Sequence, residues 1–487
     1  MAIAKREMLV ALINSLDRTE KRFFTTHYQR RSTGADDKFY QLFVHLSKGG
    51  DPTDVAFRRQ IGLDDPVKMA NLQRHLYGQL IESLRRQHRR HDKVIQVQED
   101  LDYAHLLYGR GLHLQSLLLL KKAKVQARAF HLDLHHILIL EMEKMIEGRH
   151  ITRSGEGRMV GLLAESEERR SIHEVTTRLS NLQLGLQRYF IDKGHVTSLE
   201  ESRHFHQKYY HHFTGPYSDR ATFRERISHQ RAHFWYYYCT LQLAEAADCA
   251  RAWVGVFAGD PNVRLRNLSL YLKGLDRCLM LAFFRRRPEE HREWRLGLEI
   301  FAEGLPAGRV PSIVALQNNF LHLRSRLNQL LLDHETGAYP ELAKRIGALV
   351  GVDRHKQQVL SYKLACLLAR DGKFNRSLDH LNRILDDRTP LRTDVLVYAR
   401  LLFICCHHRL GNNDLVGYAI NNLARFLVRA EYPATYPRLI LRLLRGLQRG
   451  SSPAEAMADF RERVGELTAV GFEHRELRYL EVEGLLA

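Results

Sequence analysis

The chain has 487 residues, and its 74 Lys and Arg outnumber its 56 Asp and Glu, which gives a formal net charge of +18. One hydrophobic core rarely serves a chain of this length, so we expect two or more domains or a stacked array of repeats. Hydrophobic residues at 44% and charged residues at 27% exclude extensive disorder. No apolar run approaches the roughly eighteen residues of a membrane span, and residues 1–22 lack the pattern of a secretory signal, so we expect a cytoplasmic location without a membrane partner.

Helical periodicity runs through almost every segment, and no alternating strand pattern of useful length interrupts it. Near the start, Asp17 and Glu20 form a capping-box signature, and Gly49 and Gly50 end a later apolar segment. Pro66 lies at the first turn of a long helix that is predicted to continue beyond residue 90. Further polar breaks, spaced about 20 to 45 residues apart, separate pairs of helices. The pattern predicts an all-α protein.

Two distant segments, residues 103–123 and 364–384, align with each other without a gap. The matching positions are Ala104 with Ala365, Leu107 with Leu368, Gly111 with Gly372, Ser116 with Ser377, Leu117 with Leu378 and Leu120 with Leu381. Small residues let two helices approach closely, and glycine permits a tight turn between them. The pattern resembles the tetratricopeptide repeat, which also has an aromatic residue two positions after the glycine. Phe374 provides that aromatic in the second segment, whereas His113 replaces it in the first.

Looser versions of the same pattern occur at 398–428, with Gly411 at the turn, and around 233–253. The resemblance implies a right-handed α-solenoid of tetratricopeptide-like helix pairs. We expect an N-terminal helical cap at residues 1–98, a degenerate solenoid at 99–350, and tetratricopeptide-like repeats with capping helices at 351–487.

The chain as a whole is also similar to a group of uncharacterised helical-repeat proteins from Bacteroidota. The similarity lies in LINSLDRTEKRFF, in GLHLQSLLLLKKAK and in YLEVEGLLA. That group has no assigned biochemical role, so the resemblance implies the fold and nothing about chemistry.

Residues 83–93, SLRRQHRRHDK, contain five cations and two histidines. On one continuous helix the two histidines fall on an apolar seam with Leu80, Leu84 and Ile95, and the cations fall on the opposite side. The cations are Arg85, Arg86, Arg89, Arg90 and Lys93. We favour a solvated helix face, followed by a surface for an acidic protein partner and then by a nucleic-acid surface.

The neighbouring segments also allow a helix-turn-helix interpretation, with Arg58, Arg59, Lys68 and Arg74 facing DNA. No wing-like strands follow, and the second helix is much longer than a typical recognition helix. We therefore favour a helical cap that begins the solenoid.

Two patterns suggest metal chemistry and neither is specific. Glu225, His229 and His233 share a helix face, but no H-E-x-x-H motif is present, so we expect no metal site. The cysteines form no C-x-x-C pair, so we expect small buried hydrophobic residues rather than disulfides or ligands. They are Cys239, Cys249, Cys278, Cys366, Cys405 and Cys406.

The segment HFWYYYC at 233–239 is aromatic on all sides. In a solenoid, a helix that packs between two neighbours explains this pattern as core packing. The alternative is a peptide-binding groove in which Trp235, Tyr236 and Tyr237 serve as anchors, because their rings are apolar and their tips polar.

No phosphate-binding glycine loop, no G-x-S-x-G motif and no distinctive pair of carboxylates is present, so we expect neither an enzyme nor a bound cofactor. The expected function is a protein-interaction scaffold or regulator that binds a peptide or protein on the concave side of the solenoid. The excess of arginine favours an acidic partner. The alternative is a regulatory nucleic-acid-binding protein that uses the basic N-terminal helices.

Overall fold

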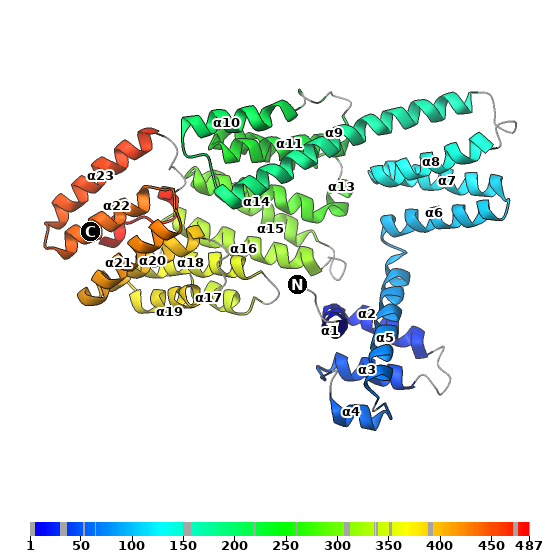
Figure 1. Cartoon of the computed structure of the whole chain (residues 1–487), viewed down its shortest axis with the longest axis horizontal. Helices are drawn as coiled ribbons and strands as arrows, with labels where there is room; N and C mark the ends of the chain where they lie inside the picture. Colours follow the sequence, from blue (N-terminus) through cyan, green and yellow to red (C-terminus); the bar gives the residue numbers. More distant parts are fainter. Residues whose placement is uncertain are drawn as a thin grey trace. The chain divides into compact units, whose positions relative to one another are not determined.

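The computed structural model describes residues 5–29, 37–51, 54–63, 65–149, 157–213, 215, 217, 221–259, 261–305, 312–335, 337, 339–349, 353–387, 393–470 and 476–486. Every regular element in these ranges is a helix and none is a strand, so the prediction of an all-α protein is confirmed. The chain divides into two compact units, Met1–His173 (unit 1) and Glu174–Ala487 (unit 2). The division falls inside the long helix α9 (Arg158–Lys193), which Figure 1 shows in green. No helix in the described ranges is long and apolar enough to cross a membrane.

Unit 1 begins with a cluster of helices around one apolar core and continues with an antiparallel set. Its helices before α9 are α1 (Lys5–Ser15), α2 (Arg18–Gln29), α3 (Asp37–Ser47), α4 (Val55–Gln60), α5 (Pro66–His88), α6 (Lys93–Gly109), α7 (His113–Ala129) and α8 (Asp133–Arg149). The expected capping box precedes α2, since the Asp17 amide donates to Glu20 and the Glu20 amide donates to Asp17, each at 2.8 Å. The core of the first five helices includes Leu9, Ile13, Leu42, Leu76 and Leu80.

Helix α5 ends at His88, so the prediction that it continues beyond residue 90 is wrong. Residues 89–92 form a turn, and α6 starts at Lys93. The Asp92 carboxylate accepts hydrogen bonds from the amides of Val94 at 2.8 Å and Ile95 at 3.3 Å. An aspartate in this position stabilises the start of a new helix, because it binds amides that have no partner within the helix. The cations of residues 83–93 are therefore divided between two helices and a turn.

Unit 2 contains the second half of α9 and all later helices. They are α10 (Leu199–Tyr209), η2 (Tyr210–His212), α11 (Phe223–Cys239), α12 (Leu243–Gly255), α13 (Pro261–Arg266), α14 (Leu268–Phe284), α15 (Pro288–Glu303), α16 (Ser312–Leu332), α17 (Pro340–Gly347), α18 (Arg354–Arg370), α19 (Phe374–Leu385), α20 (Thr393–Arg409), α21 (Asn413–Arg429), α22 (Tyr436–Gln448), α23 (Pro453–Val470), η3 (Glu476–Arg478) and α24 (Glu483–Leu486).

From α14 onward, the helices of unit 2 form two rows (Figure 1). Helices α14, α16, α18, α20 and α22 each contact the next member of the same row, which we call row A. Helices α15, α17, α19, α21 and α23 each contact the row A helix that precedes them. The result is a stack of antiparallel pairs in which each pair packs on the next, as in repeat proteins.

The two aligned segments form helix pairs with the same internal contact. In α6 and α7, the hydroxyl of Ser116 donates to the carbonyl of Ala104 at 2.8 Å. In α18 and α19, the hydroxyl of Ser377 donates to the carbonyl of Ala365 at 2.9 Å. All four residues are fully buried. The small side chains thus allow a close helix contact, and the serine hydroxyl is satisfied by a carbonyl of the partner helix.

A single turn geometry joins many of the pairs. At the α18–α19 junction, Gly372 has a φ of 71°, and the next amide, that of Lys373, donates to the carbonyl of Leu368 at 2.9 Å. This left-handed residue ends a helix by satisfying its last carbonyls. Other positions have the same left-handed backbone without glycine, with φ between 47° and 60°: His131, Leu241, Arg286, His334 and Glu431.

Enlarging the small residue at the α18–α19 contact is expected to destabilise unit 2. Ala365→Leu adds three carbon atoms at a fully buried position, which should lower the free energy of unfolding by about 1–3 kcal/mol. Denaturant unfolding measures this loss. Asn375→Leu places the same side chain at an exposed position of α19 and should change stability by no more than about 0.5 kcal/mol. Equal stabilities of the two variants would contradict the close contact.

Candidate functional site

The basic stretch of unit 1 is largely paired with carboxylates. The Arg85 guanidinium lies 3.6 Å from Glu99, and Arg89 pairs with the same carboxylate. Nε of Arg86 lies 3.0 Å from Glu82, one turn earlier on α5. The ion pairs between Arg85 or Arg89 and Glu99 connect the end of α5 to α6, so these cations contribute to the junction between the two helices.

The remaining residues of the stretch have separate environments. Arg90 is exposed in the turn, whereas the Lys93 ammonium donates to the Gln96 side chain at 2.7 Å. His88 is exposed, and its Nε2 lies 2.8 Å from a carboxylate oxygen of Glu20. The interpretation of one helix with histidines on its apolar seam and all cations on the opposite face is therefore wrong. Its cause is the helix break at residues 89–92.

The residues of the possible helix-turn-helix lie on α4, with 6 residues, and α5, with 23 residues. Arg59, Lys68 and Arg74 are exposed, and Arg58 is half-buried. None of these cations lines the basic cavity in unit 2 that is described below.

The aromatic segment on α11 lies mostly in the core of unit 2. Trp235 and Tyr236 are buried at 8% and 5% exposure, and Tyr237 is half-buried. The Tyr236 hydroxyl lies 2.6 Å from Nδ1 of His206. Core packing, the favoured interpretation, accounts for Tyr236, while Trp235 also reaches the wall of a cavity.

The two histidines among the three candidate metal ligands on α11 contact each other. The rings of His229 and His233 stack with centroids 3.9 Å apart, and burial lowers the pKa of His229 to about 4. Glu225 instead completes a capping box with Thr222. Within the ranges given above, no group of three or more His, Cys, Asp and Glu side chains could hold a metal ion.

The cysteines have the environment of apolar residues. Cys239, Cys278, Cys405 and Cys406 are buried, as the sequence predicts, whereas Cys249 and Cys366 are half-buried. Burial raises the pKa of the Cys366 thiol to about 11 and that of Cys249 to about 12. Both thiols are therefore protonated at neutral pH, and a protonated thiol is a poor nucleophile.

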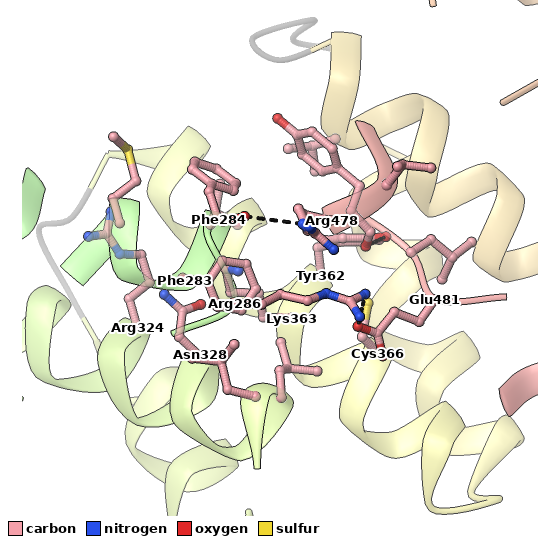
Figure 2. Close-up of a pocket in the computed structure, with 18 of the residues that line it drawn as sticks. Phe283, Phe284, Arg286, Arg324, Asn328, Tyr362, Lys363, Cys366, Arg478 and Glu481 are labelled. Carbon is pink, nitrogen blue, oxygen red and sulfur yellow. Dashed lines mark hydrogen bonds and ion pairs between the residues drawn. The ribbon is translucent and has the colours of Figure 1, made fainter. Parts of the chain in front are cut away.

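A large cavity in unit 2 is the strongest candidate for a functional site. It has a volume of about 1010 Å³ and lies between α9, α11, row A and the segment 476–486 (Figure 2). Seven cations line it against three carboxylates, with aromatic rings between them. The cations are Arg277, Arg286, Arg324, Lys356, Lys363, Arg370 and Arg478, and the carboxylates are Asp276, Glu481 and Glu483.

Two arginines from neighbouring row A helices share one carboxylate in this cavity. Arg277 of α14 lies 3.7 Å from Asp276, and Arg324 of α16 also pairs with Asp276. The Arg277 guanidinium stacks over the Trp235 ring at 5.0 Å. Burial lowers the pKa of both arginines, to about 10 for Arg324. Arginine stays protonated in proteins, so two guanidinium groups and one carboxylate leave this wall with a net positive charge.

The opposite wall is the segment 476–486, which lies across row A as a peptide ligand would. The Tyr362 hydroxyl donates to the backbone carbonyl of Tyr479 at 2.7 Å, and the Tyr436 hydroxyl donates to that of Leu480 at 2.9 Å. Tyrosine side chains from α18 and α22 thus bind the backbone of this segment.

Two charged side chains of the segment, Arg478 and Glu481, add further contacts. Arg286 lies 2.6 Å from Glu481, and Nε of Arg478 donates to the carbonyl of Phe284 at 3.1 Å (Figure 2). Four apolar side chains of the segment are buried: Leu480, Val482, Leu485 and Leu486. Each contributes roughly 1.5–3 kcal/mol by burial, so the segment is a permanent wall and the open volume beside it is the site.

Comparisons with known proteins give no relatives. No family model matches this chain, and neither a curated protein nor a solved structure matches it.

Proposed function

We propose that this protein is a non-enzymatic interaction scaffold or regulator that holds an acidic peptide or protein segment in the cavity of unit 2. The observation that carries the proposal is the positive charge of the cavity wall, which has seven cations and three carboxylates. Such an excess attracts acidic partners and disfavours basic ones. Aromatic rings such as Trp235 and Phe320 offer apolar contact between the charges.

The binding mode of the segment 476–486 supports an extended peptide as the ligand class. Row A holds this segment through tyrosine hydroxyls on its backbone carbonyls and through the ion pair between Arg286 and Glu481. A second acidic segment beside it would find the same kinds of donor. In unit 1, by contrast, the cations at 83–93 are largely paired, so we rank an acidic peptide ahead of nucleic acid.

We further infer that the chain is a right-handed α-solenoid of tetratricopeptide-like pairs, with row A on its concave side and an N-terminal helical cap at 1–98. Two observations support this inference. The same hydrogen bond from a serine hydroxyl to an alanine carbonyl occurs in α6–α7 and in α18–α19. The same left-handed turn occurs at Gly111, Gly372 and Gly411, with φ of 77°, 71° and 75°. A cytoplasmic location fits this function.

Binding of a synthetic acidic peptide tests the proposal. The probe is a fluorescein-labelled peptide of alternating Glu and Tyr, and the comparison is the same peptide with Gln in place of Glu. We expect fluorescence anisotropy to show tighter binding of the Glu peptide. Lys363→Gln removes a cation of the wall and should weaken that binding by roughly tenfold or more, because a hydrogen bond to a charged group contributes about 1.5–3 kcal/mol.

The matched control is Arg376→Gln, which removes an exposed cation of α19 and should leave the affinity unchanged. Equal binding of the Glu and Gln peptides would contradict the proposal. Tighter binding of single-stranded oligothymidylate than of the Glu peptide would support nucleic-acid binding instead.

A further inference from the structure

Four cations from three successive row A helices each lie within electrostatic range of another member near Phe320, and we call them the cation cluster. They are Lys273 and Arg277 of α14, Arg324 of α16 and Lys356 of α18. The Arg324 guanidinium lies 5.4 Å and the Lys356 ammonium 5.8 Å from the centroid of Phe320. Lys273 lies one helical turn before Arg277 on the same face of α14.

The cluster has more positive charge than its carboxylates neutralise. Asp276 is shared by Arg277 and Arg324, and Asp353 lies 2.9 Å from Lys356. Arg231 of α11 adds a fifth positive charge, because it lies close enough to repel both Lys273 and Arg277. Five cations and two carboxylates leave a net charge of +3. Partial desolvation lowers the pKa of Lys273, and repulsion from Arg231, Arg277 and Lys356 lowers it further. An anion bound here would relieve that repulsion.

Two buried polar atoms beside the cluster also have no hydrogen-bond partner. One is Nε of Arg277, and the other is Oδ1 of Asn328, whose side chain is 3% exposed and lies one turn after Arg324. Both residues line the cavity. Figure 2 shows Arg324 and Asn328 on the same wall. A buried polar atom without a partner costs about 1–3 kcal/mol, so a ligand that carries both an acceptor and a donor would recover stability here.

We propose that the cation cluster binds a doubly charged oxyanion of the phosphate-monoester type. A carboxylate brings one negative charge, whereas a phosphate monoester brings about −1.5 to −2 at neutral pH and three acceptor oxygens. That charge offsets more of the net +3 than one carboxylate would, and the phosphate oxygens give Nε of Arg277 an acceptor. A hydroxyl or amide donor next to the phosphate would satisfy Asn328. If the phosphate belongs to a phosphorylated peptide, this inference rests on the proposed function, because the bound segment would then carry the phosphate.

The test uses inorganic phosphate as the first probe and measures binding by calorimetry against chloride at equal ionic strength. We expect millimolar or tighter binding by the full-length protein. The Lys356 side chain is 39% exposed, so Lys356→Gln should keep the fold and weaken phosphate binding about tenfold, the loss of one charge-assisted contact. Arg277→Lys should weaken it as well, because lysine lacks the guanidinium fork.

Arg376→Gln is again the control and should leave phosphate binding unchanged. Absence of phosphate binding, or equal binding by wild type and Lys356→Gln, would overturn the inference. Neither measurement uses a peptide. The phosphate test therefore remains valid even if the protein does not bind the acidic peptide.

A second pair of probes identifies the source of the phosphate. The Glu and Tyr peptide with one phosphotyrosine is compared with its unphosphorylated form. Tighter binding of the phosphorylated peptide, reversed by inorganic phosphate, supports a phosphorylated segment as ligand. Phosphate binding without any gain from the phosphotyrosine supports a free phosphate compound. A third outcome is that the unphosphorylated peptide binds tightly, phosphate does not displace it, and phosphate itself does not bind. This result would support the proposed function and would overturn the inference that the cluster is an oxyanion site.

Discussion

Val482→Asp is expected to lower the free energy of unfolding of unit 2 by about 3–5 kcal/mol. Val482 lies in the segment 476–486, is 1% exposed and belongs to the core beneath row A. An aspartate in this place would bury a charge without a counterion, and removing such a charge from water is costly. The tryptophans at 235, 253 and 294 all lie in unit 2, so their fluorescence during denaturation measures this unit alone.

Glu483→Gln is the matched control from the same segment. Glu483 lies 3.0 Å from Arg461, and both side chains are more than half exposed, so its replacement should cost less than about 1 kcal/mol. We also expect Val482→Asp to weaken binding of the acidic peptide, because the segment forms one wall of the cavity. A Val482→Asp protein as stable as wild type would show that the segment is not part of the core.

Unit 2 is expected to lose about 3 kcal/mol of stability between pH 6.5 and pH 4 through His291 alone. His291 is fully buried, and its Nδ1 lies 2.7 Å from the Gln329 amide oxygen, to which it donates. Burial lowers its pKa from 6.5 to about 4. Because the pKa in the folded state lies below the unfolded value, the stabilisation is complete above pH 6.5 and is lost as the pH falls toward 4.

Denaturation by urea across this pH range measures the effect. His291→Gln should lower stability at pH 7, and its deficit relative to wild type should shrink as the pH falls, because the variant has no group to protonate at this position. The exposed His204→Gln should follow the wild-type profile. His229 is half-buried, its pKa is also lowered to about 4, and its protonation adds to the loss of stability in wild type and in both variants. Parallel profiles for wild type and His291→Gln would contradict the assignment.

The helical class and two of the helix pairs could be predicted because they depend on local signals. Ala365 and Ser377 are small at the positions where two helices touch, and Gly372 occupies a left-handed turn. Other junctions have the same turn without glycine, as at Leu241 and Arg286. These turns therefore cannot be recognised from the sequence by a glycine. The end of α5 could not be predicted either, because its only signal is Asp92, a single capping residue next to five cations.

The cavity could not be predicted from the sequence because its walls meet only after packing. The cations of the cluster come from three helices spread over residues 273–356, whereas the dense stretch at 83–93 is contiguous and is largely neutralised by carboxylates on α5 and α6. A weak signal does exist. Arg277 stands between Asp276 and the buried Cys278 in the middle of α14, and charged residues beside a buried position of a helix indicate either an ion pair or a ligand.

The wall formed by residues 476–486 has a consequence for the order of folding. The ion pair between Arg286 and Glu481 joins residues 195 positions apart, whereas the contacts within each helix pair are local in sequence. Closing a flexible loop of that length costs about 5 kcal/mol in chain entropy, so such a contact forms late. We expect the helix pairs to form first and shorten the distance that the segment must span. During refolding, ligand binding should then be regained after the helical signal, and a chain still being synthesised should contain folded pairs before it has a binding site.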